Sequence, residues 1–210
     1  MKKYLLTWYG ITDIRSAMGF EQQGPILGAL KTKQFDEVHI LAYTKKKDFS
    51  PDEIRAQQAA IKELHDRASA LAEITREESF RFLDILANTP SGHELYRKWL
   101  LQHLDDAKIN VEVSMQECFL KELNDTEGIY FSAVNALKEV CDTTAEITFF
   151  LSPGTPVMAF SWALAMMAFP NCRIKLLASP DFRKGVQTIE LPETVLNHVA
   201  NNKNKSYKNA

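Results

Sequence analysis

The stretch that most constrains this chain is an apolar segment that stops at a Ser-Pro-Gly-Thr-Pro turn, residues 152–156, and restarts as a second apolar segment. Residues 147–151 are rich in β-branched and aromatic side chains, which predicts a buried strand. Gly154 permits a turn with positive φ, Thr155 suits a helix N-cap, and the proline after it suits the first helical turn. Residues 157–169 then predict a helix that is apolar on nearly all sides and should be the most buried helix of the fold. In α/β proteins a strand, a tight turn and a helix N-terminus often form an anion site, although the stretch could also be only a well-made turn.

The start of the chain carries a second strand and turn. Residues 3–9 predict a strand, and Gly10, Ile11, Thr12 and Asp13 end it. In doubly wound sheets the first strand lies beside the first strand of the second half, and ligands bind between their carboxyl ends. We therefore expect residues 10–13 to face residues 152–156 across a crevice.

The remaining pattern predicts an α/β fold. Further strands are expected at 37–43, 110–115 and 173–178, with an alternating edge strand at 186–191. Helices are expected to start at Gly24-Pro25 and Ser50-Pro51 and to cover 77–86, 93–104 and 129–140. Three helices between strands two and three exceed what one crossover needs. The fold class expected is a Rossmann-like, mostly parallel sheet flanked by helices, with a helical insertion at about 51–107.

Composition indicates one globular domain. The chain has 210 residues, of which 45% are hydrophobic and 25% charged, enough for one core. We expect the domain to cover residues 1–199, and residues 200–210, low in hydrophobicity, to be a disordered tail or a truncated linker. The net charge of −2 offers no general attraction for nucleic acid or an anionic membrane, so an anionic ligand needs a local site.

Targeting and cysteine signals favour the cytoplasm. No apolar run approaches the roughly 20 residues that span a bilayer, and the chain enters its first strand without a signal-peptide pattern. Cys118, Cys141 and Cys172 are odd in number and widely spaced, which indicates neither a disulfide framework nor a zinc site. We therefore expect a reducing, cytoplasmic location and no membrane partner.

Three motifs carry a family resemblance. They are Trp-Tyr-Gly-Ile-Thr-Asp at 8–13, Asp-Thr-Glu-Gly-Ile-Tyr at 125–130, and Leu-Ser-Pro-Gly-Thr-Pro-Val-Met at 151–158 followed by Trp162. In this order they resemble a CARF domain, the CRISPR-associated Rossmann-fold sensor family. The chain is most similar to the N-terminal sensor of sigma-54-dependent transcription activators of the RNA-repair-operon regulator type. Those activators continue into ATPase and DNA-binding domains, which this sequence does not contain.

The resemblance implies a homodimeric sensor whose ligand is a cyclic oligoadenylate or a short RNA end and whose output is transcriptional control. It also implies that Tyr130 or the loop before it borders the ligand, although Asp125 and Thr126 could simply cap a helix. Combined with the strand ends, it gives these candidate ligand-binding residues: Tyr9, Gly10, Ile11, Thr12, Asp13, Arg15, Tyr43, Thr44, Lys45, Ser152, Pro153, Gly154, Thr155, Pro156, Met158 and Ser179.

The cations near these loops have two interpretations each. Arg15 is either a surface charge or a phosphate partner, as guanidinium geometry allows. The three lysines at 45–47 are either a solvated loop or phosphate ligands. Arg183 and Lys184, after the strand at 173–178, could also reach an anion.

Catalytic motifs are missing. The sequence has no G-x-G-x-x-G, P-loop, G-x-S-x-G or paired Cys/His metal spacing, so we predict no cofactor, no metal and no catalytic residue. The preferred function is a sensor that binds its ligand without turnover. The alternative is a metal-independent ring nuclease that cleaves a cyclic oligoadenylate, with Arg15 or Lys45 as the candidate basic residue. A dinucleotide-dependent oxidoreductase is disfavoured because the glycine fingerprint is absent.

Overall fold

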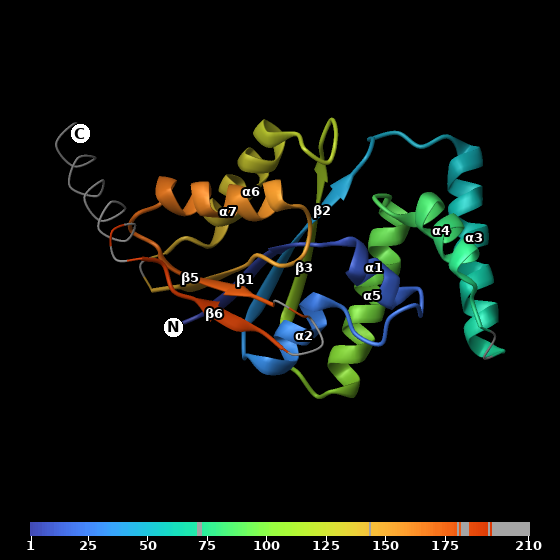
Figure 1. Cartoon of the computed structure of the whole chain (residues 1–210), viewed down its shortest axis with the longest axis horizontal. Helices are drawn as coiled ribbons and strands as arrows, with labels where there is room; N and C mark the ends of the chain where they lie inside the picture. The colour runs from blue at the N-terminus through green and yellow to red at the C-terminus, as the bar shows by residue number, and fades with distance from the viewer. Residues whose placement is uncertain (71–72, 143, 180, 182–184, 193, 195–210) are drawn as a thin grey trace.

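One six-stranded sheet forms the centre of the molecule (Figure 1). The structure is a computed structural model and describes residues 1–70, 73–142, 144–179, 181, 185–192 and 194. The strand order is β3-β2-β1-β4-β5-β6, in which neighbours are parallel except β5 and β6. The strands are β1 (Lys3–Trp8), β2 (Glu37–Thr44), β3 (Glu112–Phe119), β4 (Glu146–Phe150), β5 (Arg173–Ala178) and β6 (Gln187–Ile189). The Rossmann-like fold class is confirmed, including the antiparallel edge strand.

Helices cover both faces of the sheet (Figure 1). One face carries α1 (Ile11–Ala17), α2 (Pro25–Thr32) and α5 (Pro90–Asp106), and the other carries α6 (Thr126–Val140) and α7 (Pro156–Ala168). Side chains of β1 alternate between these layers: Leu5 lies in the core under α2 and α5, whereas Leu6 and Trp8 lie in the core under α6 and α7. A central parallel strand is buried on both faces in this way, which explains its almost continuous apolar sequence.

The helical insertion between β2 and β3 is confirmed. It consists of α3 (Pro51–Ser69), α4 (Arg76–Leu86) and α5. Of these three helices, α5 packs against the sheet, and α3 and α4 lie beyond α5 at the edge of the molecule (Figure 1). Helix α5 begins at Pro90, before the predicted start at residue 93, because Thr89 caps it by accepting the Gly92 N–H at 3.2 Å. The insertion therefore adds a second helical layer next to α1.

Three local expectations are wrong. Residues 11–17 form helix α1, whereas the sequence analysis gave residues 10–13 as the loop that ends the first strand. Strand β3 continues to Phe119, four residues beyond the prediction, because it pairs with β2 along its whole length. Helix α7 is not the most buried helix: Phe160 is 60% exposed and Met167 40%, whereas six of the eight residues of α2 are buried.

The cysteines also differ from the prediction. Cys141, at the end of α6, forms a disulfide with Cys172, just before β5, and Cys118 is buried as a free thiol. The pairing arises because the C-terminal end of α6 and the start of β5 meet at one edge of the sheet, which linear spacing does not reveal. The cysteine argument for a reducing compartment therefore does not hold. None of the helices in the described part of the chain is both long and apolar enough to cross a membrane.

Candidate ligand-binding crevice

The loops after β1 and β4 meet at the carboxyl edge of the sheet, as the sequence predicted. The two strands are paired neighbours, and the Thr7 hydroxyl donates to the Phe150 carbonyl oxygen at 3.1 Å. At Gly10 an added methyl group would lie 2.8 Å from the backbone nitrogen of Gly154. Only a residue without a side chain permits this approach. Residues 10–13 and 152–156 therefore lie side by side at the topological switch point, where the sequence predicted a crevice.

The Ser-Pro-Gly-Thr-Pro turn has the predicted local geometry. Gly154 has φ of +87°, Thr155 is the N-cap of α7, and Pro156 occupies its first position. The Thr155 hydroxyl accepts the Met158 N–H at 3.3 Å, and the Met158 sulfur lies 3.4 Å from the Thr155 nitrogen. Within the described residues, the N–H groups of Gly154 and Val157 donate to no protein acceptor. These two donors and the positive end of the α7 dipole make the turn suited to an anion.

Several candidate residues around the two loops are accessible to solvent. Ile11 is 55% exposed, Ser152, Gly154 and Pro156 are exposed, and Gly10, Thr12, Thr155 and Ser179 are half-buried. Ser152 and Ser179 are tied to each other: the Ser179 N–H donates to the Ser152 Oγ at 2.5 Å, and that Oγ donates to the Ser179 carbonyl at 3.1 Å. The pair joins the loops after β4 and β5 at the rim of the crevice.

Asp13 has an internal role. Its side chain is fully buried and accepts hydrogen bonds from the N–H groups of Gly10 and Ile26, each at 3.1 Å, with the Tyr96 hydroxyl 3.4 Å away. Burial raises the pKa of the Asp13 carboxyl to about 7, although these hydrogen bonds lower it. The residue therefore fastens the start of α1 to the start of α2, and its carboxylate is closed off from a ligand in the crevice.

A buried polar cluster lies next to Asp13, formed by Tyr9, Thr44, His93 and Tyr96. The His93 Nε2 is 3.1 Å from the Thr44 Oγ1, and its ring meets the Tyr9 ring edge-on at 5.3 Å between centroids. Burial lowers the pKa of His93 to about 4, so the imidazole is neutral at neutral pH. Among the described residues, the Tyr9 hydroxyl and the His93 Nδ1 have no hydrogen-bond partner. Sequence reasoning did not connect His93 and Tyr96 with the site, because both come from the helical insertion and carry no motif.

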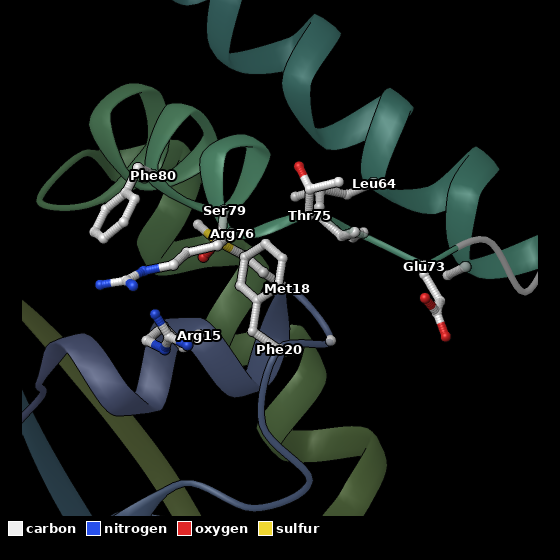
Figure 2. Close-up of a pocket in the computed structure, with 12 residues that line it drawn as sticks. Arg15, Met18, Phe20, Leu64, Glu73, Thr75, Arg76, Ser79 and Phe80 are labelled. Carbon is white, nitrogen blue, oxygen red and sulfur yellow. The ribbon is translucent and has the colours of Figure 1, made fainter.

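The other candidates are dispersed. Pro153, Tyr43 and Met158 are buried, and Met158 packs directly beneath Gly154. Lys45 is exposed at the end of β2, where its backbone N–H donates to the Asn88 carbonyl. Arg15 lies in the last turn of α1 and lines a different cavity, together with Arg76 of the insertion (Figure 2).

Tyr130 also lies away from the turn. It lines a shallow pocket with Leu164 and Met167, which belong to the second half of α7. Arg183 and Lys184 lie outside the described residues. In the described part of the chain, no group of three His, Cys, Asp or Glu side chains is arranged to hold a metal ion.

Comparison with known proteins yields likenesses among solved structures only. No protein-family model matches the sequence, and no curated protein matches it. Among solved structures, the chain is similar to Enterococcus italicus Csm6 bound to cyclic hexa-2'-fluoro-hexa-dAMP, with 16% sequence identity and a TM-score of 0.45. The match covers 97% of this chain and 39% of that protein, so the chain spans about two fifths of its length. An identity and a TM-score of this size do not assign a family or a ligand to this chain.

Proposed function

We propose that this chain is a sensor domain that binds a nucleotide second messenger, either a cyclic oligoadenylate or a short RNA end. The observation that carries the proposal is the contact between Gly10 and Gly154, which brings the two loops together at the switch point of the sheet. In open α/β sheets this is the place where ligands bind. The motif resemblance to CARF domains involves the same two loops and supports the same choice.

The chemistry of the crevice fits a phosphodiester. The N–H groups of Gly154 and Val157 are free of protein acceptors in the described residues and can donate to phosphate oxygens. The hydroxyls of Thr12 and Thr155 can donate to a phosphate or a ribose oxygen, and both side chains are partly accessible. Since the chain carries a net charge of −2, affinity for an anion has to come from such local groups.

We further propose that the sensor is a two-fold homodimer. The outward side of α7 carries Phe160, Leu164 and Met167 at positions i, i+4 and i+7, and Phe131 of α6 is 52% exposed. An apolar stripe of this kind on a helix surface is suited to a partner helix. A symmetric ligand on the dimer axis would touch the same crevice residues of both copies. Sedimentation of the wild type and Phe160→Glu tests this: we expect a dimer that the variant loses, and a wild-type monomer with and without ligand would refute it.

The proposed output is control of an effector, with transcription as its end point. This part rests on the resemblance to sensors of sigma-54-dependent activators, and the effector would be an ATPase with a DNA-binding domain. Residues 1–199 would form the sensor domain. A reporter controlled by a fusion of this chain to such an effector should respond to the ligand, and a reporter that never responds would exclude this output.

Thr155 provides the direct test of the binding site. Calorimetric titration with cyclic tetra-adenylate, cyclic hexa-adenylate and an RNA ending in a 2′,3′-cyclic phosphate identifies the ligand. Thr155→Val should then weaken binding roughly ten- to a hundred-fold, because a hydrogen bond to a charged group is typically worth about 1.5–3 kcal/mol. Loss of the N-cap alone should lower stability by about 1 kcal/mol.

The matched control is Thr32→Val, which removes a hydroxyl at the end of α2 whose hydrogen bonds in the described part of the chain lie within its own helix. It should leave affinity unchanged. Unchanged affinity for both Thr155→Val and Thr12→Val would place the ligand elsewhere, and the turn would then have only a structural role.

A further inference from the structure

A second cavity lies between α1 and the helical insertion. Its volume is about 730 Å³, and its walls come from the end of α1 and the turn after it, from α3, and from the start of α4 (Figure 2). Small-molecule sites in proteins usually have volumes of about 300–1,000 Å³. Apart from Arg15, none of the residues that line this cavity belongs to the candidate crevice residues. The cavity is therefore a separate place on the molecule.

Two arginines from distant parts of the sequence meet in this cavity. Figure 2 shows the guanidinium groups of Arg15, from α1, and Arg76, from α4, on the same side of this cavity. Each lies over an aromatic ring of the cavity wall: Arg15 is 5.7 Å from the centroid of Phe20, and Arg76 is 5.6 Å from that of Phe80. The ring contacts hold the cations in place and leave their N–H donors available.

Between them, these two arginines make one ion pair with a carboxylate in the described residues. Within the described residues Arg76 makes no ion pair, and the nearest carboxylate oxygen of Arg15, from Glu21, is 3.6 Å away. That distance exceeds the roughly 2.7–2.9 Å of a charge-assisted hydrogen bond. By contrast, Arg81 on the same insertion is 2.7 Å from Glu63. Arg76 is exposed and Arg15 is half-buried, so water screens both charges, and an anion bound in the cavity would be attracted by both.

A buried hydroxyl adds an independent signal. Ser79, on α4, lines the cavity with only 5% of its surface exposed, and its Oγ has no hydrogen-bond partner in the described part of the chain. Buried hydroxyls almost always have a partner, so an unpartnered one at the wall of a cavity points to a missing polar ligand. A phosphate held by the two guanidinium groups offers acceptor oxygens to such a hydroxyl.

The rest of the cavity indicates a ligand larger than inorganic phosphate. Met18, Phe20, Leu64 and Phe80 give it apolar and aromatic walls, and a phosphate alone would leave most of the 730 Å³ unfilled. At the other end lies Glu73, whose carboxylate points away from both guanidinium groups (Figure 2). A carboxylate there disfavours a second anion and can accept hydrogen bonds from ribose hydroxyls.

We propose that this cavity binds a nucleoside phosphate, with the phosphate between Arg15 and Arg76 and the base among the aromatic walls. This proposal does not rest on the function proposed for the crevice. The two sites are joined by α1, whose N-cap Gly10 touches the crevice turn and whose last turn carries Arg15. A ligand in the cavity therefore holds the same helix that borders the crevice.

The test uses ADP as the probe, with pyrophosphate and adenosine as its two parts. By calorimetric titration the wild type should bind ADP more tightly than either part. Arg76→Gln should weaken ADP binding roughly ten- to a hundred-fold, the usual effect of a lost hydrogen bond to a charged group. The matched control is Arg55→Gln, which removes the same charge from an exposed position on α3 that, within the described residues, pairs only with Asp52. It should bind ADP like the wild type.

Ser79→Ala separates a ligand contact from a structural role. Removal of an unpartnered buried hydroxyl should preserve or raise the melting temperature, while ADP affinity should fall. Three results would overturn the proposal: no ADP binding by the wild type at millimolar concentration, ADP binding that Arg76→Gln leaves unchanged, or ADP binding no tighter than that of pyrophosphate. ADP binding sensitive to Thr155→Val but not to Arg76→Gln would place the nucleotide in the crevice instead.

Discussion

The protonation of Asp13 should make the stability of the fold depend on pH. The residue is fully buried, and burial raises the pKa of its carboxyl from 3.8 to about 7. Below pH 3.8 the group is protonated in both the folded and the unfolded chain. As the pH rises from about 4 to about 7, the unfolded chain releases this proton and the folded chain keeps it. The free energy of unfolding therefore falls through this window and levels off above it.

The expected magnitude follows from the size of the shift. Each pKa unit corresponds to about 1.4 kcal/mol, so the whole titration of Asp13 is worth about 4 kcal/mol, and about 3 kcal/mol of it falls between pH 4.5 and pH 8. His93 acts in the opposite direction, because its pKa is lowered from 6.5 to about 4 and its contribution is lost as the pH falls. The stability of the wild type alone therefore does not isolate Asp13.

Asp13→Asn supplies the comparison, since it leaves His93 in place and cannot titrate at position 13. Urea unfolding of both proteins at several pH values gives the difference in their free energies of unfolding. Relative to the variant, the wild type should lose about 3 kcal/mol from pH 4.5 to pH 8. A constant difference would refute this reasoning: it would mean that the N–H donors of Gly10 and Ile26 keep the buried carboxylate ionised.

Three further predictions concern the crevice, its chemistry and the disulfide. Gly10→Ala should lower the free energy of unfolding by about 1–3 kcal/mol and weaken ligand binding, because the new methyl group meets the Gly154 nitrogen. If urea unfolding and ligand titration of this variant gave the wild-type values, they would contradict the close contact. The wild type incubated with cyclic tetra-adenylate should yield no linear product, and rapid cleavage abolished by Lys45→Ala would favour the ring-nuclease alternative. Replacing Cys141 and Cys172 together by serine should lower the free energy of unfolding by about 2–4 kcal/mol, and an unchanged urea midpoint would show that the bond does not stabilise the fold.

The sequence alone determined the features that depend on neighbouring residues. The positive φ of Gly154, the N-cap hydroxyl of Thr155 and the first-turn proline lie within three residues of one another, so their pattern can be read directly. The parallel strands could be read for a similar reason, because a strand buried on both faces needs an almost continuous apolar run. Strand order at β1 and β4, and with it the crevice, followed from a general rule for doubly wound sheets.

Tertiary structure alone decided the features that join distant segments. Helix α1 escaped prediction because its start is held by Asp13, which reaches the N–H of Ile26 thirteen residues away. The disulfide, the cluster around His93 and the pair Arg15 and Arg76 likewise unite segments far apart in the sequence. The contacts of His93 and Arg76 arise only when the helical insertion packs beside α1, and the disulfide forms only when the end of α6 meets the start of β5. No local periodicity or spacing records where such packing will bring two side chains together.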